Sequence, residues 1–546
     1  MDAASPYIQM TEMGPSDAGE PVHLVLISSD KNLSLNYIKA QKKTIILINN
    51  GIHPGEPDGI DACMLLAEDI LAGIAEQTFG AVNRTASRRT HFMLPKNVVL
   101  AIIPVYNIGG CLNRSPNYRI DQDGPVEKGF RGNSQNLDLN RDFIKCDSRE
   151  AITFTRIFHL LDPDVFVDNH VSDGADYQHV MTLITSQHNK LGGAMGEYLN
   201  KQFEPALYAS MKQKGYDLVP YVNHFGDTPE KGWSEFWDSP RYSSGYASLW
   251  STFSFTPETH MLKPYKQRVE ATVALMKSFI EFTSAHGQEM IALREQTRKE
   301  QRTQASFPIA WKLDRTQFTH IEYKGYAAGY KPSGVSGLPR LYYDRAKPFD
   351  IQVPFYNVYK DTLAVERPRA YIIPQGWWKV IDRLQANGVL CRILPRDTVV
   401  LVEWYRIDGF QPGARQFEGH HLNTNVQVVK TSELVTFRKG DYYIPMDRVS
   451  NRFVMEVLEP QGEDSYFTWN FFDPILGQKE GYSDYHFEDI AAEYLKKHPE
   501  VKEQLEARKV VDSAFARNGG AQLNFVFQHS EYFEPGYLRY PVYRVK

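Results

Sequence analysis

Short apolar runs alternate with segments of helical periodicity through the first 300 residues. Six runs have the length of strands, at 22–27, 44–49, 98–105, 165–168, 180–184 and 252–256. Four segments between or after them repeat apolar residues three and four positions apart, which predicts helices at 58–75, 148–161, 191–213 and 265–301. This alternation predicts an α/β fold, a mixed twisted sheet with helices on both faces.

The pattern changes after about residue 305. Short alternating segments with many aromatic residues dominate 307–448, and two further helices are predicted at 377–386 and 487–508. A chain of 546 residues is long enough for two or three domains of roughly 100 to 200 residues each. We therefore predict an α/β domain at 1–305 and a β-rich α+β domain at 306–546.

Composition and charge exclude several classes of function. The chain has 61 Lys and Arg against 66 Asp and Glu, a net charge of -5, and neither sign forms long runs. General binding to nucleic acid or to an anionic membrane is therefore disfavoured. No apolar run approaches the roughly 20 residues that cross a bilayer, so no membrane span is expected. The four cysteines stand far apart, which argues against a cysteine-based zinc site.

Four polar segments lie at predicted strand ends or in a long loop at 107–145 that is rich in Gly, Asn, Asp and Pro. Open α/β sheets place their sites at strand ends, and long loops in compact domains are usually functional. The segments are, in chain order, N-N-G-I-H-P-G-E (49–56), N-L-D-L-N-R-D-F (136–143), D-N-H (168–170) and S-F-T-P-E-T (254–259).

The first segment has the chemistry of a metal site. His53 and Glu56, three residues apart, can offer an imidazole nitrogen and a carboxylate to one Zn²⁺, and a catalytic site then needs a third protein ligand and an open position for water. The spacing alone is weak evidence, because His286 and Glu289 repeat it within a predicted helix and are explained as part of a solvated face. Each segment alone has an ordinary structural explanation, and only their joint occurrence in this order favours a site.

Taken together, the four segments resemble the zinc metallocarboxypeptidase family of the carboxypeptidase A type, in particular bacterial members with a C-terminal β-rich domain. The similarity covers about residues 7–290. It implies that His53, Glu56 and His170 hold one Zn²⁺ per chain and that Glu258 is the general base. Zinc lowers the pKa of a bound water, and a carboxylate in a partly dry cleft can take the proton of that water and pass it on.

The resemblance also implies how a substrate is held. Asn140 and Arg141 would bind the terminal carboxylate of a peptide, since a planar guanidinium can grip a carboxylate with two hydrogen bonds. The family has another arginine that stabilises the oxyanion; Arg119 and Arg131 both qualify, and we favour Arg131 because it is nearer in the loop.

The family also has a mobile tyrosine ahead of the general base. Tyr242 and Tyr246 are the candidates, and we assign Tyr246 to catalysis and Tyr242, with Arg119, to substrate binding. Asp168 and Asp173 are both candidates for orienting a ligand imidazole. The β-rich domain has no comparable set of polar residues, and we expect it to pack beside the cleft and restrict access.

The leading hypothesis is a zinc metallocarboxypeptidase that acts on peptides with a free C-terminal carboxylate. A zinc deacylase or amidase of the succinylglutamate desuccinylase and aspartoacylase type shares the ligand pattern, and an amidase acting on peptidoglycan peptides is a variant of the first hypothesis. The long loop with extra arginines and the S-F-T-P-E segment favour the carboxypeptidase. A non-catalytic peptide-binding protein is disfavoured, because it would not need Glu258.

Fewer observations bear on the cellular location of the protein. We expect a periplasmic or secreted enzyme whose export signal is not in this chain. The sequence does not predict the side-chain preference or the oligomeric state.

Overall fold

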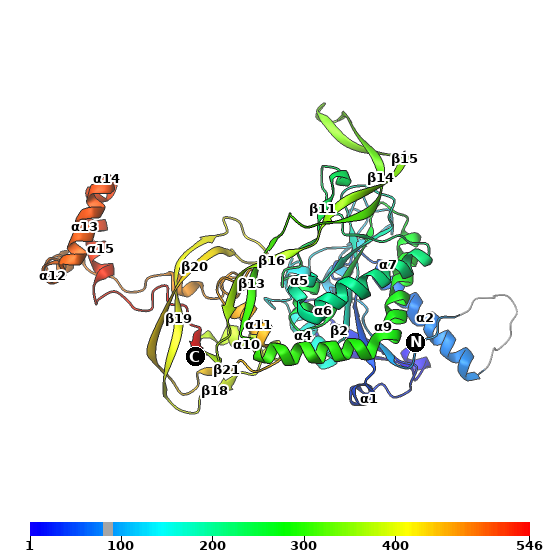
Figure 1. The fold of residues 1–546 in the computed structure, drawn as a ribbon, viewed down its shortest axis with the longest axis horizontal. Coiled ribbons are helices and arrows are strands. Elements are labelled where there is room, and N and C mark those ends of the chain that lie inside the picture. Colours follow the sequence, from blue (N-terminus) through cyan, green and yellow to red (C-terminus); the bar gives the residue numbers. More distant parts are fainter. Residues whose placement is uncertain (80–90) are drawn as a thin grey trace.

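The computed structural model describes residues 1–79 and 91–546 (Figure 1). A nine-stranded mixed sheet forms the centre of residues 1–305, which we call the N-terminal region. Eight strands follow the order β1-β2-β4-β3-β7-β12-β9-β10, and β8 pairs with β12. Their bounds are β1 Ile8–Pro15, β2 Pro21–Ile27, β3 Thr44–Asn49, β4 Val98–Ile103, β7 Val165–Asp168, β8 His170–Ser172, β9 Met181–Thr185, β10 Val219–Pro220 and β12 Phe253–His260.

Alternate side chains of the central strands enter two separate cores. Ile46 and Ile48 of β3 face one core, and Ile45 and Leu47 face the other. This arrangement confirms the predicted mixed sheet with helices on both faces. The first core is covered by α2 (Asp58–Phe79), α6 (Gly193–Tyr198), α7 (Glu204–Gln213) and α9 (Tyr265–Thr303), and the second by α4 (Arg149–Leu161) and α8 (Ser243–Ser248).

Local sequence explains where several of these helices begin and end. The Ser148 side chain accepts a hydrogen bond from the Ala151 N–H and caps α4. The helix predicted at 191–213 is interrupted: α5 (His188–Leu191), α6, a π-helical turn (Leu199–Phe203) and α7 follow one another. Gly192 and Gly193 both have a positive φ, 70° and 54°, and end α5. β1 was not predicted, because Ile8 is its only buried residue.

Residues 306–546, the C-terminal region, are rich in β-structure, as predicted. β13 (Ser306–Leu313) pairs with β16 (Tyr359–Glu366), and the long hairpin of β14 (Thr319–Pro332) and β15 (Pro339–Tyr356) projects from the molecule (Figure 1). β15 also pairs with β11 (Trp233–Ser234) of the N-terminal region. A six-stranded sheet consists of β17 (Ala370–Ile373), β18 (Arg392–Ile393), β19 (Thr398–Pro412), β20 (Asn423–Phe437), β21 (Tyr442–Pro445) and β22 (Tyr543–Val545).

The helices of the C-terminal region form two groups. α10 (Trp378–Ala386) and α11 (Asn451–Leu458) pack into the main core. The helix predicted at 487–508 is divided between α12 (Asp484–Lys497) and α13 (Pro499–Val511), because Pro499 cannot continue α12. With α14 (Ser513–Ala516) and α15 (Gly519–His529), they form a small core of their own, and Figure 1 shows this helical group at one end of the molecule.

The long helix α9 links the two regions. Its 39 residues span about 59 Å and run from the nine-stranded sheet towards the six-stranded one (Figure 1). One apolar core is continuous between the regions, since Phe158 and Tyr246 belong to the same cluster as Tyr371 and Phe453. The predicted boundary at 305 and 306 falls in the short link between α9 and β13. Within the described residues, no helix is long and apolar enough to cross a membrane.

Candidate metal centre

Two histidines and a glutamate meet beyond the ends of two neighbouring strands, β3 and β7. His53 and Glu56 lie in the loop between β3 and α2, and His170 begins β8. All three residues are buried, and the candidate ligand atoms lie within 4.8 Å of one another. His53 Nδ1 is 3.2 Å from Glu56 Oε1, and His170 Nδ1 is 3.1 Å from Glu56 Oε2. This cluster has the ligand types and the size that one Zn²⁺ needs.

Each imidazole is oriented by an aspartate on its other nitrogen. His53 Nε2 lies 2.9 Å from Asp138 Oδ1, and His170 Nε2 lies 2.9 Å from Asp168 Oδ2. A proton on each Nε2 leaves each Nδ1 free to bind a metal, as in carboxylate–histidine–metal sites. His53 Nδ1 is buried and has no hydrogen-bond partner, so its lone pair suits a cation at the centre.

The charges around the cluster also favour a cation. Burial alone would raise the pKa of Glu56, but Arg119 and His53 hold it well below its ordinary value. Burial disfavours a charged His170, yet Asp168 and Glu56 raise its pKa well above the ordinary value. The centre therefore holds an ionised carboxylate between two imidazoles that each face an aspartate, a set of groups that a divalent ion would stabilise.

Glu258 lies beside the cluster and has no partner for its carboxylate. It stands on β12, in register with His170 of β8. Within the described parts of the chain, no hydrogen bond or ion pair reaches its side-chain oxygens. Burial and the nearby Glu56 raise the pKa of Glu258 to about 8, although His170 opposes that rise. A bound divalent cation would lower this pKa. A carboxyl group whose pKa lies near neutral pH can act as a general acid or base.

The predicted carboxylate-binding pair lines the same cavity, which has a volume of about 330 Å³. The Arg141 guanidinium lies 4.5 Å from the centre of the Tyr242 ring. The Asn140 Oδ1 accepts a hydrogen bond from the Ser243 N–H at 3.3 Å. A fixed cationic group thus stands in the cavity that also contains the candidate ligands His53, Glu56 and His170, which we call the metal cluster. We call this cavity the metal cavity.

Both candidate arginines for the oxyanion face the cluster. Arg119 Nη1 donates to Glu56 Oε1 at 2.8 Å. Arg131 lies 3.5 Å from the same oxygen and 3.0 Å from Asp138 Oδ2, and its side chain is 49% exposed. Both are within reach of the cavity, and the choice of Arg131 stays a prediction.

The assignment of Tyr246 to catalysis is wrong. Tyr246 lies on α8 and is fully buried against α4, and its hydroxyl donates to Asn387 Oδ1 at 2.6 Å. It does not line the metal cavity, whereas Tyr242, the residue before α8, does. The two tyrosines are four residues apart, and the sequence alone could not tell which one α8 carries into the core.

Several cavity residues were missed. Tyr221, Phe225 and Phe236 line the cavity, but among 31 tyrosines and 30 phenylalanines nothing distinguished them. Asp138 could have been found, because it precedes Asn140 by two residues in the same motif. Asp173 lines the cavity without touching either imidazole.

The comparison with known families agrees with this geometry. A family model described as zinc carboxypeptidase matches residues 2–179. This part of the chain is similar to zinc carboxypeptidases. The matched residues of the zinc carboxypeptidase model include the three candidate metal ligands and the Asn140–Arg141 pair, but they end before Glu258.

Similar proteins cover only part of the chain. The chain is similar to Carboxypeptidase 2 of Trichophyton tonsurans, 28% identical over 117 residues, which is 21% of this chain and 22% of that protein. Carboxypeptidase 2 of Trichophyton rubrum is 27% identical over 133 residues, 24% of each chain. The match thus spans about a quarter or less of the length of these relatives. A solved metallo-carboxypeptidase from Burkholderia cenocepacia has a TM-score of 0.35 at 17% identity, over 51% of this chain and 65% of that one.

We predict that Asp168→Asn lowers the affinity for Zn²⁺ by about 10- to 100-fold, because the amide no longer fixes the His170 tautomer as the carboxylate does. Competition with a fluorescent zinc chelator measures this change. Asp173→Asn, which alters an acid that touches neither imidazole, serves as the matched control and should bind zinc normally. Equal affinity in both variants would contradict the role given to Asp168.

Proposed function

We propose that the protein is a zinc-dependent metallocarboxypeptidase that hydrolyses the C-terminal peptide bond of peptides. The observation that carries this proposal is the presence, in one cavity of about 330 Å³, of the His53–Glu56–His170 cluster, the unpaired Glu258 and the guanidinium of Arg141. A deacylase would share the cluster, but the zinc carboxypeptidase match of residues 2–179 favours a peptidase.

The residues divide the reaction between them. When bound to His53, Glu56 and His170, Zn²⁺ would acidify a water and polarise the scissile carbonyl. Glu258 takes the proton of the attacking water and transfers it to the nitrogen of the leaving amine. Arg131, or Arg119 in its place, stabilises the negative charge that develops on the carbonyl oxygen.

Arg141 fixes which bond is cut. Its guanidinium, stacked on Tyr242, holds the terminal carboxylate with Asn140, so that the last peptide bond lies beside Glu258. This arrangement predicts cleavage at the chain end only, since a peptide without a free C-terminus offers Arg141 no carboxylate.

The C-terminal region supports this recognition site through a buried aspartate. Asp464 is fully buried and accepts hydrogen bonds from the Arg241 N–H at 2.9 Å and from Arg241 Nε at 2.8 Å. Residues 241–243 in turn carry Tyr242 and the N–H that binds Asn140. We infer that the C-terminal region positions the carboxylate-binding pair in addition to flanking the cleft.

Paired peptides with free and amidated C-termini test the proposal by mass spectrometry. The zinc-loaded protein should remove single residues stepwise from the free ends only. Arg141→Ala should lower kcat/KM on the free peptides by about 10- to 100-fold, the equivalent of one lost charge-assisted hydrogen bond, and barely change any activity on amidated ones. Trimming of neither form by a zinc-loaded protein would contradict the proposal, and equal losses on both would remove Arg141 from recognition of the chain end.

Glu258→Gln should keep the zinc content and slow turnover by about 10² to 10⁴, the usual scale for a lost general base. The measurement is kcat on a free-ended peptide, with zinc determined by atomic absorption. Glu204→Gln, a partly buried glutamate outside this cavity, is the control and should retain turnover. Near-normal kcat in Glu258→Gln would exclude it as the base.

Asp464→Ala should raise KM for free-ended peptides by about 10-fold, because the recognition loop loses its anchor, while kcat and zinc content change little. Glu463→Ala is the matched control, since Glu463 is the neighbouring acid but accepts from Trp237 and not from Arg241. A loss confined to kcat, with KM unchanged, would contradict the positioning role of Asp464.

A further inference from the structure

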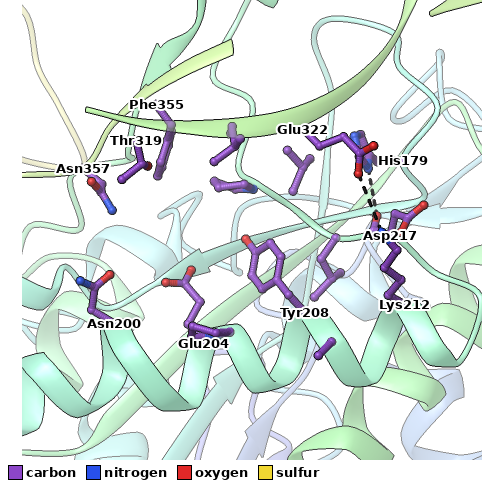
Figure 2. Close-up of a pocket in the computed structure, with 16 residues that line it drawn as sticks. His179, Asn200, Glu204, Tyr208, Lys212, Asp217, Thr319, Glu322, Phe355 and Asn357 are labelled. Atoms are coloured by element: carbon purple, nitrogen blue, oxygen red, sulfur yellow. Dashed lines mark hydrogen bonds and ion pairs between the residues drawn. The ribbon is translucent and has the colours of Figure 1, made fainter. Parts of the chain in front are cut away.

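A second cavity lies between α7 and the β14–β15 hairpin (Figure 2). Its volume is about 490 Å³, within the range of small-molecule sites. Asn200, Glu204, Tyr208 and Lys212, spaced by four residues, line one side. Residues of β10 and of the hairpin line the other sides. None of its lining residues lines the metal cavity, so the two spaces are distinct.

One end of this second cavity holds the Glu204 carboxylate without a cation, and Glu235 lies near Glu204 outside the lining. The Glu204 carboxylate accepts a hydrogen bond from Thr185 Oγ1 at 2.9 Å, and the nearby Glu235 accepts one from Gln187 Nε2 at 3.2 Å. Among residues 1–79 and 91–546, no Lys, Arg or His side chain forms an ion pair with either glutamate. Burial raises the pKa of Glu204 to about 7. Carboxylates withdrawn from water are normally paired, and the partly buried Glu204 has no counter-charge among the described residues.

A tyrosine hydroxyl at the same end also lacks a partner. Figure 2 shows Glu204 and Tyr208 pointing from α7 into the cavity. The Tyr208 Oη is inaccessible to solvent and makes no hydrogen bond to any described residue. A buried hydroxyl without a partner costs free energy that a bound donor or acceptor would recover. The Glu204 carboxylate and the Tyr208 hydroxyl, one turn apart on α7, therefore both have room for a partner that a ligand could supply.

The other residues that line the cavity indicate which class of molecule would bind there. Phe355, Ile321, Val219 and Pro205 give the middle of the cavity an apolar surface. The two basic lining residues have partners away from Glu204: Lys212 lies 4.0 Å from Glu322, which also lines the cavity, and His179 is held by the Asp217 carbonyl and the Lys324 N–H. An apolar body with a positive head fits this distribution of groups.

We propose that this cavity binds a small organic cation, a primary ammonium or guanidinium on an apolar body. The cationic head pairs with the Glu204 carboxylate, and a small rotation of the Tyr208 side chain brings its covered hydroxyl within reach as an acceptor. The body packs against Phe355 and Ile321, and the ring of Tyr208 adds a cation–π contact. This site goes beyond the proposed peptidase, because none of its residues belongs to the metal cavity.

Calorimetry on the zinc-loaded protein tests this site with 2-phenylethylammonium and its neutral isostere 2-phenylethanol. The wild type should bind the ammonium at least tenfold more tightly than the alcohol. Glu204→Gln should remove this preference, and Tyr208→Phe should weaken binding of the ammonium. Arg141→Ala and Glu258→Gln should leave the preference unchanged, which separates this cavity from the peptidase site.

Ala209→Trp, which fills the cavity from an exposed position on α7, provides a second test if Glu204→Gln does not fold, and should abolish binding of both compounds. Equal binding of ammonium and alcohol by the wild type, or a preference that survives Glu204→Gln, would overturn the proposal. So would a loss of the preference in Glu258→Gln, or no binding of the ammonium at roughly 10 mM, weaker than any specific site of this kind.

Discussion

Buried negative charge at the ends of β3, β7 and β12 is the constraint on which the site depends. Glu56, Asp138, Asp168 and Glu258 surround two buried imidazoles, and buried charges are stable only when they are paired. Arginines of the long loop pair with Glu56 and Asp138, and His170 pairs with Asp168. Glu258 has no such partner among the described residues, and burial together with Glu56 raises its pKa to about 8.

The sheet order explains why this charge gathers at one point. β3, β7 and β12 are parallel neighbours, so the residues that follow them meet at the same edge. His53 and Glu56 follow β3, His170 follows β7, and Glu258 stands in β12 opposite His170. The metal cluster is assembled from separate strands, and it keeps its geometry because the hydrogen bonds between neighbouring strands fix their positions. Loss of that register would separate the ligands even with every ligand residue intact.

The sequence predicted the parts of the site that short motifs encode and missed those that tertiary packing selects. The candidate metal ligands lie in short segments at strand ends, and the Asn140–Arg141 pair lies in a short helical turn of the long loop. Tyr246 was misassigned because its burial depends on contacts with Asn387 and α4, far away in the sequence. For the same reason the cavity aromatics, such as Tyr221, could not be told from core residues. The central strands of the sheet were predictable because both of their faces are buried, while the exposed edge strand β1 left no such pattern.

The C-terminal region completes the fold as well as adding to it. β10 is the last strand of the nine-stranded sheet, and an uncovered edge strand exposes unpaired backbone groups. The hairpin packs beside this edge, where Val219 of β10 shares an apolar cluster with Tyr323 and Val353. Covering the edge with a hairpin, and not with another paired strand, leaves room for the second cavity next to Val219. The metal cavity presents guanidinium groups that suit an anion, and the second presents carboxylates that suit a cation. In the proposed roles, Arg141 recognises an anionic chain end and Glu204 an organic cation, so a ligand that suits one cavity is disfavoured by the other.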